Sequence, residues 1–141
     1  MTDVSEVGTK NATWAVPRDS VVLTLPAVSA YLSVLRTATA GLAARLDFTL
    51  DEIEDLRIAV DEACAMLLSG SRPDSELRCR FELEGNQIDV AVTIASKDGK
   101  LPARDTFAWT VLTALAGEVD SDRDEENNVT IRLVKRKGGT A

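Results

Sequence analysis

The sequence contains no histidine, and aromatic residues make up only 4% of the chain. Histidine is the commonest metal ligand and the usual general base near neutral pH. Its absence excludes a Ser-His-Asp triad and argues against a zinc site. Acid–base chemistry in this chain would therefore depend on a carboxylate or a lysine.

Cysteine is also scarce, since Cys64 and Cys79 are the only two in the chain. Two cysteines are too few for a disulfide framework, and a chain of 141 residues can form a core without one. We therefore expect two free thiols in a reducing compartment. The favoured interpretation of each is a buried, apolar side chain, and a redox sensor is the alternative.

Positive charge and long apolar segments are lacking as well. The chain has 16 Lys and Arg against 23 Asp and Glu, a net charge of −7. This balance disfavours bare nucleic acid, which needs clustered cations, and is compatible with a basic protein partner. The longest uncharged segment, 20–35, is too short to cross a membrane, and residues 1–13 are too polar for a secretory signal. We expect a cytoplasmic protein with no nucleic-acid or membrane partner.

The length and the apolar content of 45% predict one folded domain. We expect a loose N-terminal arm at residues 1–12, a domain at 13–136 and a C-terminal tail at 137–141. The apolar run 21–25 predicts a buried strand, and Pro26 marks where a first helix could begin. Its inner residues would be Val28, Leu32, Leu35, Thr39, Leu42 and Leu46.

A second helix is predicted to begin at a capping box formed by Thr49 and Glu52. Its inner residues would be Ile53, Leu56, Val60, Ala63 and Leu67. Two segments of alternating polarity follow, 77–84 and 88–95, and Gly85-Asn86 between them is a suitable hairpin loop.

A third helix is expected at about 105–119, then a charged loop at 121–128 and a last strand at 129–134. The inner residues of that helix would be Phe107, Val111, Leu115 and Val119. The order strand–helix–helix–strand–strand–helix–strand predicts an α+β fold. It would be a two-layer sandwich of a mostly antiparallel sheet with helices on one face.

Two stretches carry a family resemblance: DLRIAVDEACAMLL at 55–68 and TFAWTVLTALAGEV at 106–119. They resemble the RsbW-type anti-sigma factors, which are serine kinases of the GHKL ATPase superfamily with a Bergerat-like fold. The resemblance covers about residues 20–135 and best fits the actinobacterial branch, whose members are often short and divergent.

The resemblance implies roles for individual residues. Glu62 matches the family's general base. An asparagine one helical turn later ligates Mg²⁺ in the family, and Met66 stands at that position here. Because a thioether is a poor ligand for a hard cation, the resemblance leaves this chain without a metal ligand.

The other nucleotide motifs of the family are degenerate here. Asp98 and Gly99 correspond to the adenine-binding D-x-G-x-G, but they are adjacent and the second glycine is missing, so Asp98 could be only the tip of a turn. The family's glycine-rich segment opens the third helix beneath the phosphates. Residues 106–109 replace it, and their bulky side chains would stand where phosphate should lie.

The resemblance implies an anti-sigma factor, active as a homodimer in a stress or developmental response. It would capture an alternative RNA polymerase sigma factor and be countered by a STAS-type anti-anti-sigma factor, with no cofactor. The first alternative is an active Mg-ATP-dependent serine kinase that phosphorylates the anti-anti-sigma factor, with Glu62 as base. The second is an unrelated α+β protein with a structural or small-ligand role.

Several further residues have two interpretations. Trp109 is interpreted as core or dimer packing rather than a ligand platform, and Trp14 either pins the arm or docks a partner. The acidic run of Asp120, Asp122, Asp124, Glu125 and Glu126 superficially resembles a calcium loop, but a solvated loop is favoured because its spacing is wrong. For Arg78, Arg80 and Arg132, a solvated sheet face is favoured over a functional basic stripe.

Overall fold

The computed structural model describes residues 19–138. In chain order its elements are β1 (Asp19–Pro26), the 3-10 turn η1 (Ser29–Tyr31), α2 (Leu32–Arg45), α3 (Leu50–Leu68), β2 (Glu76–Glu84), β3 (Gln87–Ala95), α4 (Phe107–Ala116), β4 (Glu118–Arg123) and β5 (Asn128–Arg136). The expected arm, Trp14 and the last three residues of the expected tail lie outside the described residues.

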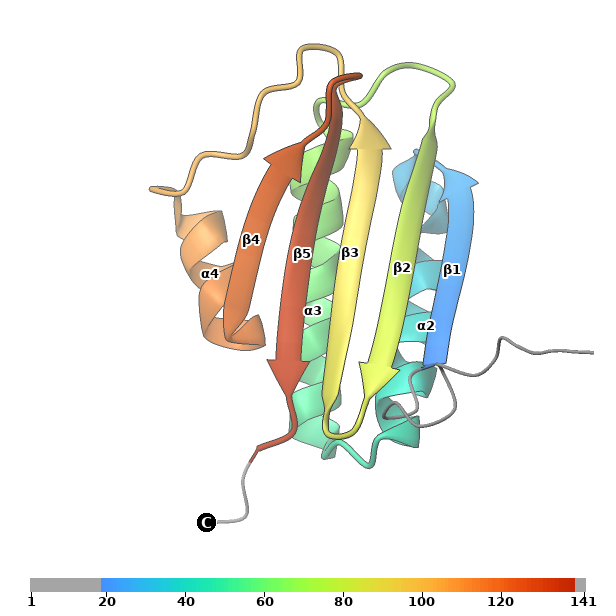
Figure 1. The fold of residues 1–141 in the computed structure, drawn as a ribbon, viewed down its shortest axis with the longest axis vertical. Coiled ribbons are helices and arrows are strands. Elements are labelled where there is room, and N and C mark those ends of the chain that lie inside the picture. Colours follow the sequence, from blue (N-terminus) through green and yellow to red (C-terminus); the bar gives the residue numbers. More distant parts are fainter. Residues whose placement is uncertain (1–18, 139–141) are drawn as a thin grey trace, which may run out of the picture.

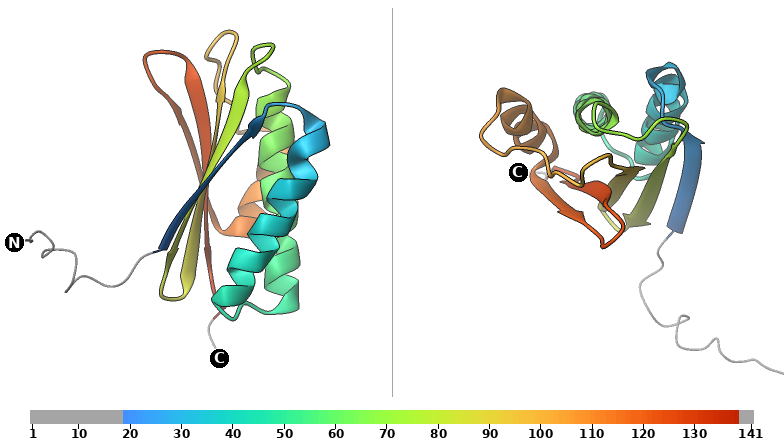
Figure 2. Two further views of the ribbon diagram at one scale, coloured as in Figure 1. Left: turned by 90° about the vertical axis from the view of Figure 1, so that its right-hand side faces the viewer. Right: turned by 90° about the horizontal axis from the view of Figure 1, so that it is seen from above.

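The strands form one antiparallel sheet in the order β1-β2-β3-β5-β4. Figure 1 shows this order, and Figure 2 shows α2, α3 and α4 side by side on one face of the sheet. Within residues 19–138, no helix lies on the other face of the sheet. The predicted two-layer α+β fold is confirmed, with one strand more than expected.

The core lies between the helices and the inward side chains of the central strands. The predicted hairpin of β2 and β3 is confirmed, and its Gly85 has a φ of +59° that a glycine adopts without strain. The inward residues of the two strands are buried: Leu77, Cys79, Phe81, Leu83, Ile88, Val90, Val92 and Ile94.

Helix α3 lies between α2 and α4 over the sheet (Figure 2). Its predicted capping box is confirmed: the Glu52 amide donates to Thr49 Oγ1 at 3.1 Å, and the Thr49 amide donates to the Glu52 carboxylate at 2.8 Å. The bond from the Thr49 amide lowers the pKa of the Glu52 carboxyl. The cap fixes where α3 begins, and the helix carries Glu62 and Met66 in its second half.

The strand at 21–25 is confirmed, but the prediction that it is buried is wrong. Strand β1 is an edge strand without a fully buried residue, and Val22 is 43% exposed. A short apolar run does not distinguish a central strand from an edge strand. Pro26 ends this strand instead of beginning a helix. The first helix starts at Leu32 and leaves Val28 exposed.

The largest difference from the prediction lies at 105–128. Helix α4 ends at Ala116, before Gly117 with a φ of +101°, and 118–123 form strand β4 instead of a helix end and a charged loop. The buried residues of α4 are Trp109, Leu112 and Ala116, while Phe107 is 83% exposed. The segment that forms α4 is apolar on almost every side of the helix. The spacing of its apolar residues therefore fits two different choices of buried face. Edge strands often carry charged side chains, and the acidic side chains of β4 therefore resemble those of a loop in the sequence.

Within residues 19–138, none of the helices is long and apolar enough to cross a membrane.

Candidate functional site

A hollow of about 290 Å³ lies where α3 and β3 end at the same side of the molecule. Its walls come from the end of α3, the end of β3, the loop before α4 and one residue of β5. The lining residues are Met66, Leu67, Ser69, Gly70, Ile94, Ser96, Asp98, Lys100, Leu101, Pro102, Ala103 and Val129. The fold therefore brings Met66 and Asp98, two of the predicted site positions, to one pocket.

Glu62 stands apart from this pocket. It is half-buried on α3, one helical turn before Met66, and it does not line the hollow. Met66 contributes a thioether to the wall at the position expected for the metal ligand. Within residues 19–138 no group of three or more His, Cys, Asp or Glu side chains could hold a metal ion.

Asp98 and Gly99 form a turn that its own hydrogen bonds stabilise. The Asp98 carboxylate accepts the Lys100 amide at 2.9 Å and the Ser96 hydroxyl at 3.3 Å. The bond from the Lys100 amide is the main reason that the pKa of the Asp98 carboxyl is lowered. The Gly99 amide donates to Ser96 Oγ at 2.9 Å, so the turn closes around this buried serine.

Gly99 has a local structural role that needs no ligand. Its φ is +71°, and an added Cβ would lie 2.3 Å from Asn127 Oδ1. Its carbonyl accepts Arg123 Nη1 at 3.0 Å, and the Ser96 amide donates to the Asn127 carbonyl at 2.9 Å. These contacts join the pocket loop to the β4–β5 turn. No local sequence pattern indicates Ser96, Arg123 or Asn127, because these residues meet only in the folded chain.

The start of α4 is closed by its own cap. Thr106 Oγ1 accepts the Trp109 amide at 3.1 Å, so that amide is not free for a phosphate. Phe107 turns outward into solvent, and Trp109 turns inward, which confirms its core interpretation. Residues 106–109 do not line the pocket, and the expectation that their side chains stand where phosphate should lie stays a prediction.

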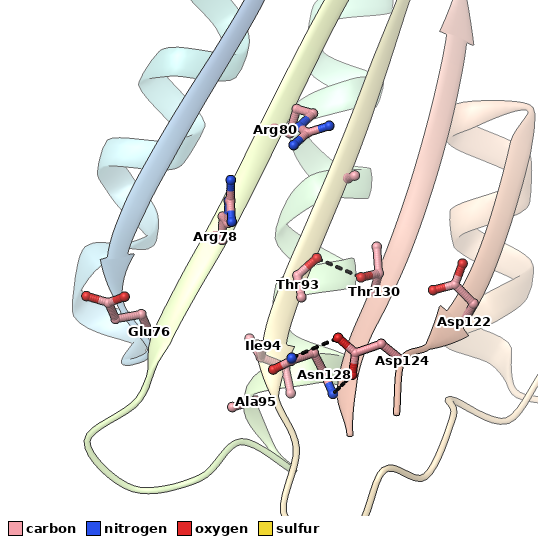
Figure 3. Close-up of a pocket in the computed structure, with 11 residues that line it drawn as sticks. Glu76, Arg78, Arg80, Thr93, Ile94, Ala95, Asp122, Asp124, Asn128 and Thr130 are labelled. Carbon is pink, nitrogen blue, oxygen red and sulfur yellow. Dashed lines mark hydrogen bonds between the residues drawn. The ribbon is translucent and has the colours of Figure 1, made fainter. Parts of the chain in front are cut away.

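A second, wider hollow of about 580 Å³ lies on the open sheet face (Figure 3). Arg78 and Arg80 flank it from β2, and Asp122 of β4 and Asp124 of the following turn flank it on the other side. Arg132 is not part of this hollow. It pairs with Asp89, and this bond raises the pKa of the guanidinium. Because charges of both signs line the hollow, it is a polar groove rather than a continuous basic stripe.

Both cysteines are free thiols with no exposed surface. Burial raises the pKa of the Cys64 thiol to about 12, and it raises the pKa of Cys79 as well. Thiolates are the reactive form of cysteine, so this burial favours the apolar interpretation over a redox sensor.

The pocket residues do not fit Mg-ATP as the resemblance would place it. The Asp98 carboxylate is already bound within its turn, and Met66 offers sulfur where Mg²⁺ requires oxygen.

Comparison with known proteins identifies relatives. No family model matches the chain. It is 34% identical to the anti-sigma-F factor RsbW of Mycobacterium tuberculosis over 93 residues, which are 66% of this chain and 55% of that protein. It is 34% identical to the serine-protein kinase RsbW of Bacillus subtilis over 77 residues, 52% of this chain and 48% of that protein. The chain is a homologue of the RsbW proteins.

This RsbW homologue spans about half the length of the relatives it matches. Its fold matches a crystal structure of the RsbU and RsbW domains of Rv1364c from Mycobacterium tuberculosis with a TM-score of 0.68. That match covers 87% of this chain and 34% of the other, at 17% sequence identity. At this identity the likeness shows the fold alone.

Proposed function

We propose that this RsbW homologue is a cytoplasmic anti-sigma factor that captures an alternative RNA polymerase sigma factor. A STAS-type anti-anti-sigma factor would compete for it and free the sigma factor, and the working unit would be a homodimer. The observation that carries this proposal is the 34% identity to a protein named anti-sigma-F factor RsbW. Capture needs only a complementary surface, so it does not depend on the nucleotide.

We further propose that capture proceeds without productive ATP binding. Three features support this: the thioether of Met66, the internally bound carboxylate of Asp98 and the capped start of α4. Phosphoryl transfer depends on metal and positioning more than on a base alone. The retained Glu62 is then a remnant of the family's base.

The test is a binding titration between the purified chain and each alternative sigma factor of its source organism, with and without Mg-ATP. We expect one sigma factor to bind with an affinity that Mg-ATP leaves unchanged, and a STAS-type partner to displace it. Glu62→Ala is the matched control and should bind equally well. Failure of every sigma factor to bind would contradict the proposal.

A second candidate is the active serine kinase, favoured by the relatives named serine-protein kinase RsbW and by the retained Glu62. It predicts transfer of the γ-phosphate to the STAS-type partner, and Glu62→Ala would abolish that transfer. Met66→Asn sharpens the choice, because it restores the amide oxygen alone. We expect no ATP binding in this variant, since Asp98 and the start of α4 remain committed to other bonds.

A further inference from the structure

The charged side chains of the open sheet face fall into two groups. Most form ion pairs: Asp89 with Arg132, Glu118 with Arg136, and Asp120 with Arg104. Among residues 19–138, four charged strand residues of this face have no side-chain hydrogen bond or ion pair: Glu76, Arg78, Arg80 and Asp122. All four line the hollow of about 580 Å³. The unpaired charge of this face is therefore gathered in one place.

The strand register places opposite charges on the two sides of this hollow (Figure 3). Arg78 of β2 lies beside Thr93 of β3. Thr130 of β5 follows in the same row across the sheet, and Asp122 of β4 ends the row. Three strand spacings of about 4.8 Å put about 14 Å between the backbones of Arg78 and Asp122. No ion pair joins the two side chains across this width, so both charges stay available to a partner.

The floor between the two charged walls is made of short side chains. Ala91, Thr93, Ala95 and Thr130 are half-buried, and the two threonine hydroxyls form a hydrogen bond of 2.6 Å. From Ala91 to Ala95 the floor is about 13 Å long. An α-helix is about 10–12 Å across with its side chains and rises about 5.4 Å per turn. About two turns of a helix therefore fit between the walls.

We propose that this hollow binds an α-helix of a partner protein, with about two turns of the helix lying along β3 and β5. One flank of the helix carries two carboxylates, four residues apart, opposite Arg78 and Arg80. Their rise of about 6 Å is close to the separation of about 6.7 Å between two arginines that stand two residues apart on one strand. The other flank carries a lysine or an arginine opposite Asp122, and small residues such as alanine and serine face the floor.

The charges and the backbone of this face favour a protein helix over nucleic acid or an added strand. Carboxylates line the hollow beside the guanidinium groups, and the chain has a net charge of −7, so a phosphate backbone would be repelled. Strands β2, β3 and β5 each pair on both sides, so the hollow offers no free edge to an added strand. A helix with carboxylates on one flank can instead form charge-assisted hydrogen bonds with both arginines.

The test is fluorescence anisotropy with the purified full chain at low ionic strength. The probe is a labelled, stapled helical peptide of alanine and serine, with two glutamates four residues apart on one flank and two lysines on the opposite flank. The control peptide has the same composition, but one glutamate and one lysine are exchanged, so each flank carries both signs. We expect the probe to bind about tenfold more tightly than the control peptide.

Variants that exchange the charges of the two walls test the contacts themselves. Arg78→Glu/Arg80→Glu should weaken probe binding by about tenfold or more, because two attractions become repulsions. When Asp122→Arg is added to this variant, the same probe fits in the reverse direction, so its affinity should return. Arg45→Glu/Arg57→Glu is the matched control, because it makes the same change of charge on helices α2 and α3. It should bind the probe as the wild type does, and circular dichroism should show all variants folded.

Equal affinities of the two peptides, or no binding of either, would overturn the inference. Unchanged binding in Arg78→Glu/Arg80→Glu would overturn it as well, and so would no recovery when Asp122→Arg is added. A wild-type dimer that this double variant converts to a monomer in sedimentation would assign the hollow to a second copy instead. Sigma-factor titrations on the same samples keep the two proposals apart. Capture without probe binding would refute this inference alone, whereas probe binding without capture would refute the proposed function alone.

Discussion

Strands β1 and β4 lie at opposite edges of one sheet, yet their outward backbone groups have different surroundings. The Asp124 amide donates to the Asn128 carbonyl in line with the β4–β5 register, so the outward groups of β4 belong to its odd residues. The central one, the Ser121 amide, donates to the Asp120 carboxylate at 2.9 Å. Arg104 holds that carboxylate at 2.7 Å. The Ala27 amide donates to the Ser75 carbonyl at 3.0 Å in line with the β1–β2 register, so the outward groups of β1 belong to its even residues. Among residues 19–138, nothing comparable covers the amide of Val22 on β1.

The difference shows how one edge of a sheet can be protected from further strand pairing while the opposite edge is not. Strand β4 is short, charged and tied to the pocket loop through Arg123 and Gly99. Strand β1 is longer and uncharged from Ser20 to Leu25. Protected edges avoid unwanted pairing, so an unprotected, regular edge is a candidate for a specific partner.

Proline substitutions at neighbouring residues of β1 test this comparison with the largest expected effect. Val21→Pro removes a donor that bonds to β2 and should destabilise the monomer by about 3 kcal/mol. Val22→Pro removes only an outward donor and should lower monomer stability by about 1 kcal/mol or less. Urea denaturation at protein concentrations below dimer formation measures both. Equal losses of stability in the two variants would show that the odd residues of β1 are not the ones that bond to β2.

On the β4 side, Gly99→Ala should destabilise by about 1–2 kcal/mol, because alanine is strained at positive φ and its Cβ would displace Asn127. The loss would loosen the contact between the pocket loop and the end of β4. Gly41→Ala is the control: its added Cβ meets nothing within 4 Å on exposed α2, and it should stabilise by about 0.5–1 kcal/mol. Thermal melts measure the stability of both variants. An unchanged stability in Gly99→Ala would show that the contact between the pocket loop and the end of β4 does not stabilise the fold.

Local signals explain how much of this fold the sequence predicts. The alternation of β2 and β3 and the Thr49–Glu52 capping box depend on neighbouring residues, and both are confirmed. Strand β4 was missed because its acidic side chains resemble those of a loop. The edge position of β1 was missed because burial depends on which elements lie above a strand, and no local pattern encodes that.

In the candidate site, too, local patterns predict some residues, and other residues are found only through the folded structure. Spacing along α3 and the family resemblance led to Glu62 and Met66, and the fold places Met66 and Asp98 at one pocket while Glu62 stays outside it. The contacts among Ser96, Asn127 and Gly99 join segments far apart in sequence. They became visible only once the chain was folded.

Removal of the β4 protection should convert that edge into an unprotected one. Asp120→Ala frees the Ser121 amide and releases Arg104, so we expect dimers to associate into larger species in light scattering, with little change in stability. Asp122→Ala is the control, since in the described structure its carboxylate covers no outward amide. Unchanged association in Asp120→Ala would show that this carboxylate does not protect the edge.

The same protection should depend on pH. The hydrogen bond from Arg104 lowers the pKa of the Asp120 carboxyl below its ordinary value. A lowered pKa means that the protection is fully present above the unfolded pKa and is lost as the pH falls through the folded one. Larger species should therefore form in the wild type only below about pH 4, the ordinary aspartate range. Their appearance at pH 6 would contradict this assignment.

The smallest expected effect concerns Cys79, which pairs with Leu23 across the β1–β2 ladder. Because both cysteines are buried with raised pKa values, neither should react quickly with a thiol reagent at pH 8, and slow labelling would follow local opening. If dimer formation holds β1 in place, the labelling of Cys79 should slow by about tenfold at dimer-forming concentrations. The labelling of Cys64 on α3 should slow less.

Labelling in Cys64→Ala and Cys79→Ala separates the two thiols, and Val22→Glu should remove the concentration dependence. Equal slowing of both thiols would mean that they become accessible by global unfolding, not by release of β1.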